Sequence, residues 1–424
     1  MPEVTRALIL GTDEAGYGPN LGPLVLGASA WTMSLSKEQT ERLPPLESFA
    51  APRLTSTSAP APNKPTPRRR LPAAASQTLS LFELVDAPQT PCDSTIPEAE
   101  SVNPFDALPD ALNERLYEIA QRRAIFPLMD SKRLYLAGKT LHALERSYWL
   151  ARALIAPDAL SKPLAFRAQT QTIDHRRTLG LTQEETLPPW EEQFDCALPL
   201  DARVGDLADL QADRDKIHEY LKTRGLNLCA LTTRRVQPRQ FNALIKRLAL
   251  KSDLIAEVTL ATLAETLICA LSRDDVHAPQ GVYALALCDK LGGRDHYAQA
   301  LRERFPQAQL TILREAREQS VYRLLAQRAR VRDSSVRDLP SAVALEVRFT
   351  AKGERYVPTA LASICAKYWR EISMHAFNVF WRKQLSDELR PTAGYPVDAI
   401  RFRNDVEKTR RRLGISDEEF WRVK

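Results

Sequence analysis

The residues best suited to chemistry in this sequence are acidic and follow apolar stretches. Asp13 and Glu14 come directly after an apolar run that ends at Leu10, and a glycine-containing turn follows them. Adjacent carboxylates in such a place repel each other and lose hydration, and a divalent cation would offset both effects. On a regular strand they point to opposite faces, so a shared site requires the strand to end or twist there. A solvated turn is the alternative interpretation.

Two further carboxylates occupy comparable positions. Asp289 closes an apolar run that begins at Val282, and open α/β sheets bind ligands at the carboxyl ends of their strands. The same residue would serve equally well as the N-cap of a helix starting near Arg294. Glu354 lies in a charged loop before a helix, an arrangement that is also common without a catalytic role. Each carboxylate alone is therefore an ambiguous signal.

The elements that must position these residues follow two periodicities. Apolar runs predict strands over 7–10, 24–31, 281–289, 309–313 and 344–349. Apolar residues at helical spacing predict helices over 111–124, 207–224, 241–271 and 359–379, a further helix that ends at 154, and one after 401. Strands interleaved with helices predict an α/β fold.

The composition predicts insertions in this fold. The chain has 424 residues, 44% hydrophobic and 26% charged, and this balance excludes wholesale disorder. Its 29 prolines concentrate between Pro44 and Pro109, among Ala, Ser and Thr. Such a segment buries too little apolar surface to offset its ordering entropy, so we expect 40–108 to be a disordered insertion. The proline-punctuated stretch 157–203 indicates a second insertion.

Several classes of protein are disfavoured by the same sequence. No apolar run approaches about 18 residues, so we expect no membrane-spanning helix and no membrane partner. The short run before Asp13 lacks the shape of a signal peptide. Six scattered cysteines without a Cys-x-x-Cys pair fit a reducing cytoplasm and argue against a zinc ribbon or a disulfide framework. The net charge of +6 permits a nucleic-acid partner without demonstrating one. The cysteines thus indicate a cytoplasmic protein. No heptad repeat stands out, so we expect a monomer.

Five blocks of the sequence, taken in order, resemble ribonuclease HII. Asp13-Glu14-Ala15-Gly16-Tyr17-Gly18-Pro19 is similar to that family's Asp-Glu-Ala-Gly-Arg-Gly-Pro, and Asp130-Ser131-Lys132-Arg133-Leu134 to its Asp-Ser-Lys-Lys-Leu. Cys288-Asp289 closes a strand where the family has Asp-Gly. Lys352-Gly353-Glu354 with Ala362-Ser363-Ile364-Cys365-Ala366-Lys367 looks like its Lys-Gly-Asp and Ala-Ser-Ile-x-Ala-Lys, and Gly394-Tyr395-Pro396 matches its Gly-Tyr-Pro. The resemblance covers roughly 5–34, 125–137 and 240–405, about half the chain.

The resemblance implies a fold and an activity. The fold would be ribonuclease H-like, a mixed sheet flanked by helices, with large insertions and a helical C-terminal extension. The catalytic domain would comprise 1–39 and 109–405, with 138–239 as a poorly matched insertion and 406–424 as a basic helical tail. The activity would be hydrolysis of the RNA strand of RNA–DNA hybrids, or of ribonucleotides embedded in duplex DNA. Asp13, Glu14, Asp289 and Glu354 would bind two Mg²⁺ or Mn²⁺ ions, which prefer oxygen ligands.

The other matched blocks imply substrate contacts. Backbone amides of Gly16, Tyr17 and Gly18 would face the ribonucleotide 2′-hydroxyl, the group that distinguishes RNA from DNA. Tyr395 would stack on a sugar. The phosphates would be contacted by Ser131 and Lys132, and the strand or the site would be positioned by Ser363 and Lys367. None of the six histidines is assigned as a general base.

Departures from the family pattern leave alternatives open. Tyr17 stands where the family has Arg, Glu354 where it has Asp, and Lys290 where it has Gly. Glu354 and Tyr17 motivate a second hypothesis, a catalytically impaired hybrid-binding protein on the same scaffold. An unrelated metal-dependent phosphotransfer enzyme is a third hypothesis. Two basic clusters would either extend the nucleic-acid footprint or form solvated helix faces: Arg234, Arg235, Arg239, Lys246, Arg247 and Lys251, and Arg401, Arg403, Lys408, Arg410, Arg411 and Arg412.

Overall fold

The computed structural model describes most of the chain outside its predicted insertions. The described residues are 6–46, 49, 103, 105–121, 126–128, 131, 134, 141–160, 164–165, 187–200, 204, 207–273, 276, 281–290, 293–327, 342–351 and 353–423. Most of the predicted insertion 40–108 and much of 157–203 lie outside these ranges. Asp130, Lys132 and Lys352 also lie outside them.

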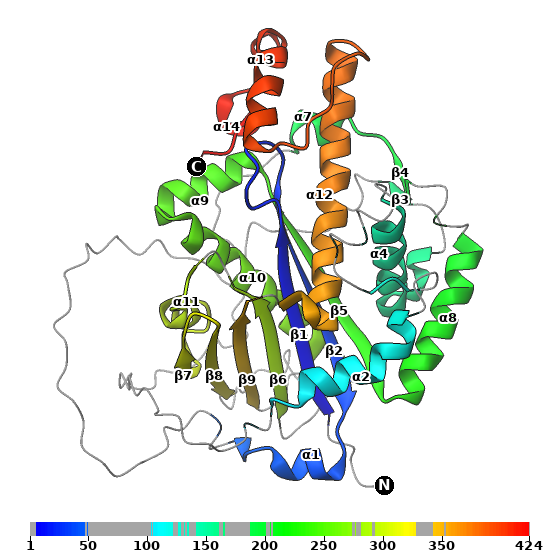
Figure 1. Ribbon diagram of the computed structural model, residues 1–424, viewed down its shortest axis with the longest axis vertical. Coiled ribbons are helices and arrows are strands. Elements are labelled where there is room, and N and C mark those ends of the chain that lie inside the picture. The colour runs from blue at the N-terminus through cyan, green and yellow to red at the C-terminus, as the bar shows by residue number, and fades with distance from the viewer. Residues whose placement is uncertain are drawn as a thin grey trace, which may run out of the picture.

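Seven strands form one mixed sheet in the described part of the chain (Figure 1). They are β1 (Arg6–Ala15), β2 (Leu24–Ser34), β5 (Leu226–Val236), β6 (Val282–Asp289), β7 (Gln309–Glu315), β8 (Gln319–Gln327) and β9 (Ala342–Thr350), in the order β5-β2-β1-β6-β9-β8-β7. β1, β6 and β9 run parallel, and the remaining pairs are antiparallel. The three parallel strands therefore end at one edge of the sheet, where ligands bind in α/β folds.

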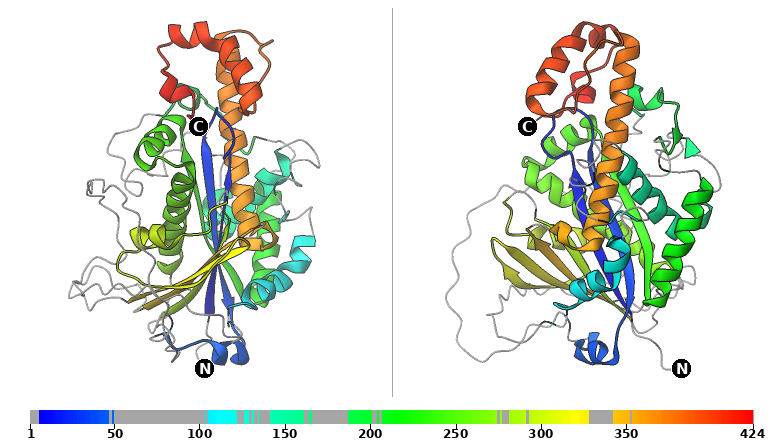
Figure 2. Two further views of the ribbon diagram at one scale, coloured as in Figure 1. Left: turned by 60° about the vertical axis from the view of Figure 1, so that its left-hand side comes forward. Right: turned by 45° about the vertical axis from the view of Figure 1, so that its right-hand side comes forward.

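Helices cover both faces of the sheet (Figures 1 and 2). One face carries α2 (Leu108–Gln121), α4 (His142–Ile155), α8 (Leu207–Thr223) and the long α12 (Val357–Gln384), and the other carries α9 (Pro238–Leu248), α10 (Lys251–Leu271) and α11 (Ala298–Arg304). The helices α13 (Pro396–Arg412) and α14 (Asp417–Phe420) pack on the far end of α12, and α1 (Lys37–Arg42) lies at the opposite end of the molecule. The shorter elements are η2 (Pro157–Leu160), β3 (Leu164–Ala165), α7 (Pro189–Glu192), β4 (Ala197–Leu198) and η6 (Gly353–Arg355).

Strand alternation explains the two apolar cores. Ala7 and Ile9 of β1 belong to the core beneath α12, whereas Leu8 and Leu10 belong to the core beneath α10. A sheet buried on both faces needs apolar residues at successive positions, which is the pattern in this strand. The α/β prediction, a mixed sheet flanked by helices, is thus confirmed.

The ends of the predicted 40–108 insertion belong to the ordered fold. Helix α1 begins after Ser36, whose side chain accepts a hydrogen bond from the Gln39 backbone N–H. Phe49 and Phe105 are both buried, and their rings pack edge to face with centroids 5.5 Å apart. Two residues within the segment predicted to be disordered therefore belong to the buried core.

Two parts of the sequence form different elements from those predicted. The strands β5 and β8 were not anticipated. The apolar stretch 241–271 is not one helix, because α9 ends at Ala249, which has a positive φ of 65°, and α10 begins at Lys251. By length and composition α10 could cross a membrane, with a mean hydropathy of 1.8, but 72% of its most apolar window is buried within the fold. It therefore packs as a core helix.

Candidate active site

Helix α12 lies directly on the backbone of the two central strands. A Cβ atom added at Gly11 of β1 would lie 2.2 Å from the Pro358 carbonyl carbon, and one added at Gly27 of β2 would lie 2.1 Å from the Ala362 oxygen. Both contacts are impossible for any residue with a side chain. The two glycines therefore allow the close approach that brings Ser363 of α12 to the carboxyl end of β1.

Asp13 is the buried centre of the candidate site. Asp13 is only 5% exposed. Ser363 donates a hydrogen bond to its carboxylate, and the Asp13 Oδ2 atom is buried without a hydrogen-bond partner. Burial raises the pKa of Asp13 well above its usual range, and the charges of Glu14, Glu354 and Asp289 raise it further, against the opposing hydrogen bond. All four predicted carboxylates therefore lie close enough to interact electrostatically.

Parallel pairing explains why Asp13 and Asp289 are neighbours. The strands β1 and β6 pair up to Thr12, which lies opposite Cys288, and the two aspartates are the next residue on each strand. The N-cap alternative for Asp289 is wrong, because α11 begins at Ala298 with Tyr297 as its N-cap. The causes that shift the pKa of Asp13 are burial, three carboxylates and the hydrogen bond from Ser363.

Glu354 reaches the same strand end through a backbone hydrogen bond. The Gly353 N–H donates to Asp289 Oδ1 at 2.9 Å, and Gly353 opens the short helix η6 that carries Glu354. This bond ties the loop after β9 to the end of β6. The turn after Asp289 differs from the family pattern, since Lys290 pairs with Asp295 at 2.6 Å rather than pointing toward the carboxylates.

Glu14 follows Asp13 on β1, which stays paired with β2 as far as Ala15 opposite Val25. The strand therefore does not end at the two carboxylates, although its pairing with β6 ends at Thr12. After burial, the charge of Glu14 is the next cause of the raised pKa of Asp13. Glu14 thus borders the strand end that carries Asp289, and its ligand role stays a prediction.

The donor set fits a divalent cation, although no group of three His, Cys, Asp or Glu in the described ranges forms a preassembled metal cluster. Carboxylates repel one another and stand apart when no cation lies between them. The set contains only oxygen donors, which Mg²⁺ and Mn²⁺ accept, and Asp13 Oδ2 is a buried oxygen with no other partner. A cation here would relieve the burial and repulsion that raise the pKa of Asp13. The individual ligand roles stay predictions.

The predicted recognition turn and Tyr395 lie side by side. Gly16 has a φ of +87°, and an added Cβ would lie 2.5 Å from the Arg370 Nε atom. A Cβ added at Gly18 would lie 4.0 Å from Tyr395 Cε1. Arg370 donates to the Ala393 carbonyl at 2.9 Å, and its guanidinium lies 5.8 Å from the Tyr395 ring centroid. Arg370 therefore lies between the two predicted substrate-contacting segments.

A positive charge lies next to Tyr17 in the turn that follows β1. The Lys251 Nζ atom lies 4.4 Å from the centroid of the Tyr17 ring, within the range of a cation–π contact. Lys251 is the first residue of α10, placed there by the sharp α9–α10 corner. A cation thus accompanies the tyrosine that replaces the family's arginine.

The two predicted serines form an internal pair. Ser131 Oγ and Ser363 Oγ lie 2.9 Å apart, and each residue is 3% exposed. Ser131 is therefore buried against Ser363, and its predicted phosphate contact stays a prediction. Lys367 lies one helical turn beyond Ser363, with Nζ 3.8 Å from Glu371 Oε1. Its predicted role stays untested.

Most of the basic clusters form ion pairs within the protein. Arg234 and Arg235 of β5 are buried and pair with Glu265 at 2.5 Å and Glu191 at 2.9 Å. The prediction that these two arginines contact nucleic acid is therefore wrong, because both side chains point into the fold. The exposed Lys246 pairs with Glu418 at 2.5 Å.

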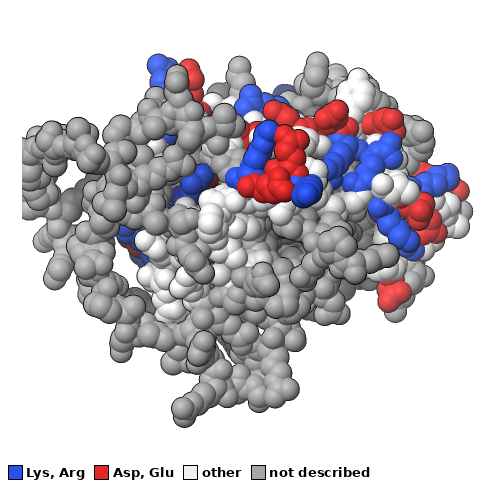
Figure 3. Space-filling model, turned by 90° about the horizontal axis from the view of Figure 1, so that it is seen from below, with Lys and Arg blue, Asp and Glu red and all other residues white. Residues whose placement is uncertain are grey.

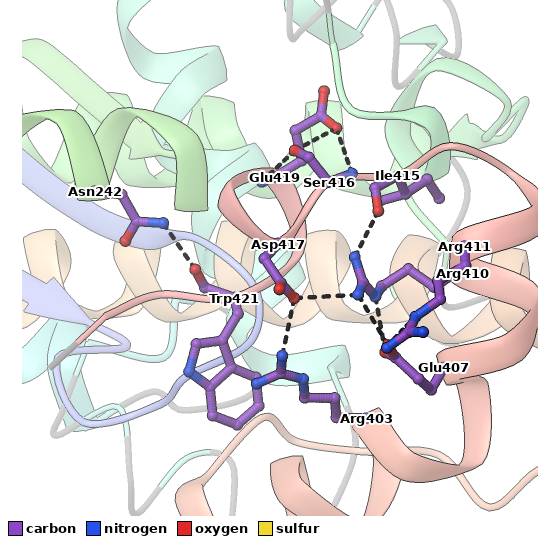
Figure 4. Close-up of polar contacts among 10 residues, drawn as sticks. All are labelled: Asn242, Arg403, Glu407, Arg410, Arg411, Ile415, Ser416, Asp417, Glu419 and Trp421. Carbon is purple, nitrogen blue, oxygen red and sulfur yellow. Dashed lines mark hydrogen bonds and ion pairs between the residues drawn. The ribbon is translucent and has the colours of Figure 1, made fainter.

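The basic residues of the tail also form ion pairs within the protein. Arg403 pairs with Asp417 at 3.0 Å, and the buried Arg410 pairs with Glu407 at 3.1 Å (Figure 4). Viewed from the end where α1 lies, Lys and Arg alternate with Asp and Glu over the described surface (Figure 3). The excess positive charge therefore does not by itself mark a nucleic-acid footprint.

The described elements form an α/β fold, a mixed sheet flanked by helices, with carboxylates at the ends of parallel strands. No family model and no curated protein sequence matches the chain. Among solved structures, the chain is similar to the ribonuclease H2 from Pyrococcus horikoshii OT3, with 13% identity, a TM-score of 0.30, and coverage of 97% of this chain and 92% of that one.

Two other ribonucleases H are similar to a comparable degree. The ribonuclease HII of Archaeoglobus fulgidus, solved in complex with PCNA, shares 12% identity with a TM-score of 0.29, covering 98% of this chain and 94% of that one. The Bst ribonuclease HIII, solved in complex with Mn²⁺, shares 12% identity with a TM-score of 0.32, covering 99% and 67%.

Sequence reasoning missed three residues around the site. Lys251 was grouped with a basic cluster, Arg370 lies in a helix chosen for other residues, and Arg422 was not singled out in the tail. All three contact residues that are distant in sequence, so no local pattern marks them. The only available signal was the Tyr17 departure, which invites a search for a compensating cation.

Proposed function

We propose that this protein is a divalent-metal-dependent endoribonuclease that cleaves the RNA strand of RNA–DNA hybrids or ribonucleotides embedded in duplex DNA. The observation that carries the proposal is the buried Asp13, whose pKa is raised by burial and by the charges of Glu14, Glu354 and Asp289, and whose Oδ2 atom has no hydrogen-bond partner. Such a set is costly unless a cation binds it.

The proposed chemistry assigns separate tasks to the residues of the strand ends. Asp13, Glu14, Asp289 and Glu354 would hold Mg²⁺ or Mn²⁺, which when bound supplies activation of the attacking water and charge stabilisation of the leaving oxygen. Ser363 orients the Asp13 carboxylate through its hydrogen bond. The Gly353 N–H fixes one oxygen of Asp289, leaving the other for a ligand.

The proposed substrate contacts involve the turn and its neighbours. The amides of the Gly16–Gly18 turn would read the 2′-hydroxyl, and Tyr395 beside Gly18 would stack on the sugar. Tyr395 is 55% exposed and Tyr17 is 37% exposed, so both rings are accessible. The cation that would contact the adjacent phosphate is Lys251, which lies over Tyr17.

The test uses purified protein and a duplex that contains one ribonucleotide, compared with the same duplex made entirely of DNA. We expect cleavage only of the first, only with Mg²⁺ or Mn²⁺, and a loss of about 10³-fold or more in kcat for Asp13→Asn and Asp289→Asn. Ser34→Ala, at the other end of β2, is the control and should retain parental activity. Undiminished cleavage by the two aspartate variants would remove these carboxylates from the site, and hybrid binding without cleavage under any divalent ion would identify a binding protein instead.

A further inference from the structure

The segment that follows α13 folds back and is fixed to that helix (Figure 4). Arg410 donates to the Ile415 carbonyl at 2.6 Å. Asp417 pairs with Arg403 at 3.0 Å and with Arg410 at 3.2 Å. Ser416 caps the short helix α14. Residues 415–423, the return segment, are therefore held in one conformation rather than trailing from the helix.

Asn242 of α9 fastens the other side of the return segment. Its Nδ2 atom donates to the carbonyls of Glu418 at 3.2 Å and Trp421 at 2.8 Å, and its Oδ1 accepts from the Val423 N–H at 2.9 Å. Three hydrogen bonds from one buried amide side chain fix both ends of this stretch. Arg422, between them, is thereby set in one place.

Arg422 joins the return segment to the loop that follows β1. Its backbone N–H donates to the Asn20 carbonyl at 2.8 Å, and the Asn20 side chain donates back to the Arg422 carbonyl at 3.0 Å. The Arg422 guanidinium donates to the Pro19 carbonyl. Pro19 follows Gly18, the last residue of the predicted recognition turn.

The same loop is bonded on its other side to the turn that precedes Tyr395. The N–H groups of Asn20 and Leu21 both donate to the Gly394 carbonyl, at 2.8 and 3.3 Å. The loop therefore lies between Arg422 on one side and Gly394 on the other. Its position decides how the Gly16–Gly18 turn faces Tyr395.

Stability does not account for the charge of Arg422. The residue is 1% exposed, and burial together with the charge of Arg370 lowers its pKa to about 9. Among the described residues no carboxylate contributes to its pKa, and its Nε and Nη1 atoms are buried without hydrogen-bond partners. The Phe241 ring, 4.9 Å away, is a weaker partner for a cation. Burying a charge without an opposite charge beside it costs free energy.

We propose that the return segment positions the recognition turn, and that Arg422 is the positioning residue that holds the Pro19 carbonyl, and with it the Gly16–Gly18 turn, at a fixed distance from Tyr395. This inference rests on the proposed function, because it assigns the turn to ribonucleotide recognition. Arg422 itself touches no substrate; it acts through the loop.

The experiment compares Arg422→Met with the parent protein and with Arg422→Lys. For Arg422→Met we expect thermal stability equal to or above that of the parent, kcat little changed, and a KM for the single-ribonucleotide duplex raised about ten- to a hundredfold, since small displacements of positioning groups have effects of this size. Arg422→Lys keeps a donor for the Pro19 carbonyl and should recover most of the loss. Lys37→Gln removes an exposed ion pair of α1 at the other end of the molecule, and its KM should equal that of the parent.

The outcomes separate this inference from the proposed function. A parental protein that neither cleaves nor binds the duplex removes both. If it binds without cleaving, the dissociation constant replaces KM and the same ranking of variants is expected. Parental activity with an unchanged KM in Arg422→Met, or an equal loss in Lys37→Gln, overturns the positioning role. Should Arg422→Met fail to fold, Asn20→Ala, which removes one hydrogen bond of the same junction, is expected to raise KM in the same direction by a smaller factor.

Discussion

At the scale of single residues, the environment of Asp13 sets its protonation. Burial is the largest influence and the neighbouring carboxylates add to it, so the pKa of Asp13 is raised above its unfolded value of about 3.9. The folded state therefore keeps a proton that the unfolded chain has already lost. The stabilising effect of this proton is fully present below the unfolded pKa and is lost as the pH rises through the folded pKa.

The Asp13→Asn variant should reveal this linkage in metal-free buffer. An amide needs no proton, so the variant should be more stable than the parent at pH 7, by about 2–4 °C in Tm for each kcal/mol relieved. The difference should shrink toward pH 4, where the parental carboxyl is neutral. Thermal unfolding with a chelator at several pH values measures it. Added Mn²⁺ should raise the Tm of the parent alone, and an equal rise in Asp13→Asn would place the ion elsewhere.

The contact between Lys251 and Tyr17 leads to a second prediction at this scale. If Lys251 contacts a phosphate beside Tyr17, Lys251→Gln should reduce the slope of log K against log salt for a duplex by about 0.9. Lys246→Gln is the matched control, because Lys246 already pairs with Glu418. Binding titrations over a range of salt concentrations would decide, and identical slopes for the two variants would exclude the contact.

At the scale of elements, the position of α12 depends on two glycines. An alanine at Gly27 would place its Cβ 2.1 Å from the Ala362 oxygen, so the helix must move away from the sheet and take Ser363 with it. We expect Gly27→Ala to lower the free energy of unfolding by about 1–3 kcal/mol, as overpacking does, and to reduce cleavage as well. Urea denaturation and an activity assay measure the two effects. Gly293→Ala, where nothing lies within 4 Å of the added atom, should cost only about 1 kcal/mol of backbone strain and leave cleavage intact.

The elements also show why prediction succeeded unevenly. Strands with uninterrupted apolar runs, such as β1 and β6, were recognised because both of their faces are buried. The strand β5 was missed because Arg234 and Arg235 look like a basic surface, whereas each pairs with a glutamate 31 or 44 residues away in sequence. Glu14 was expected where the strand would end, but pairing with β2 continues past it. Interactions over such distances leave no periodic pattern in the sequence.

At the scale of the whole molecule, the candidate site draws on segments from nearly the full length of the chain. Asp13, Asp289 and Glu354 come from β1, β6 and the loop after β9, and α12 places Ser363 behind them. The parallel strand ends and their order could be anticipated from the matched blocks. The return segment could not, because its bonds to Pro19 and Asn20 span about 400 residues.

That span has a consequence for local opening of the native protein. The backbone hydrogen bond from Arg422 to Asn20 and those from Asn20 and Leu21 to Gly394 belong to one junction, so the three amides should become accessible to solvent together. We expect their hydrogen–deuterium exchange to share one rate, faster than that of the β1 and β6 amides, because the junction can separate while the sheet stays closed. Exchange at three unrelated rates would show that the three hydrogen bonds of this junction open one by one rather than together.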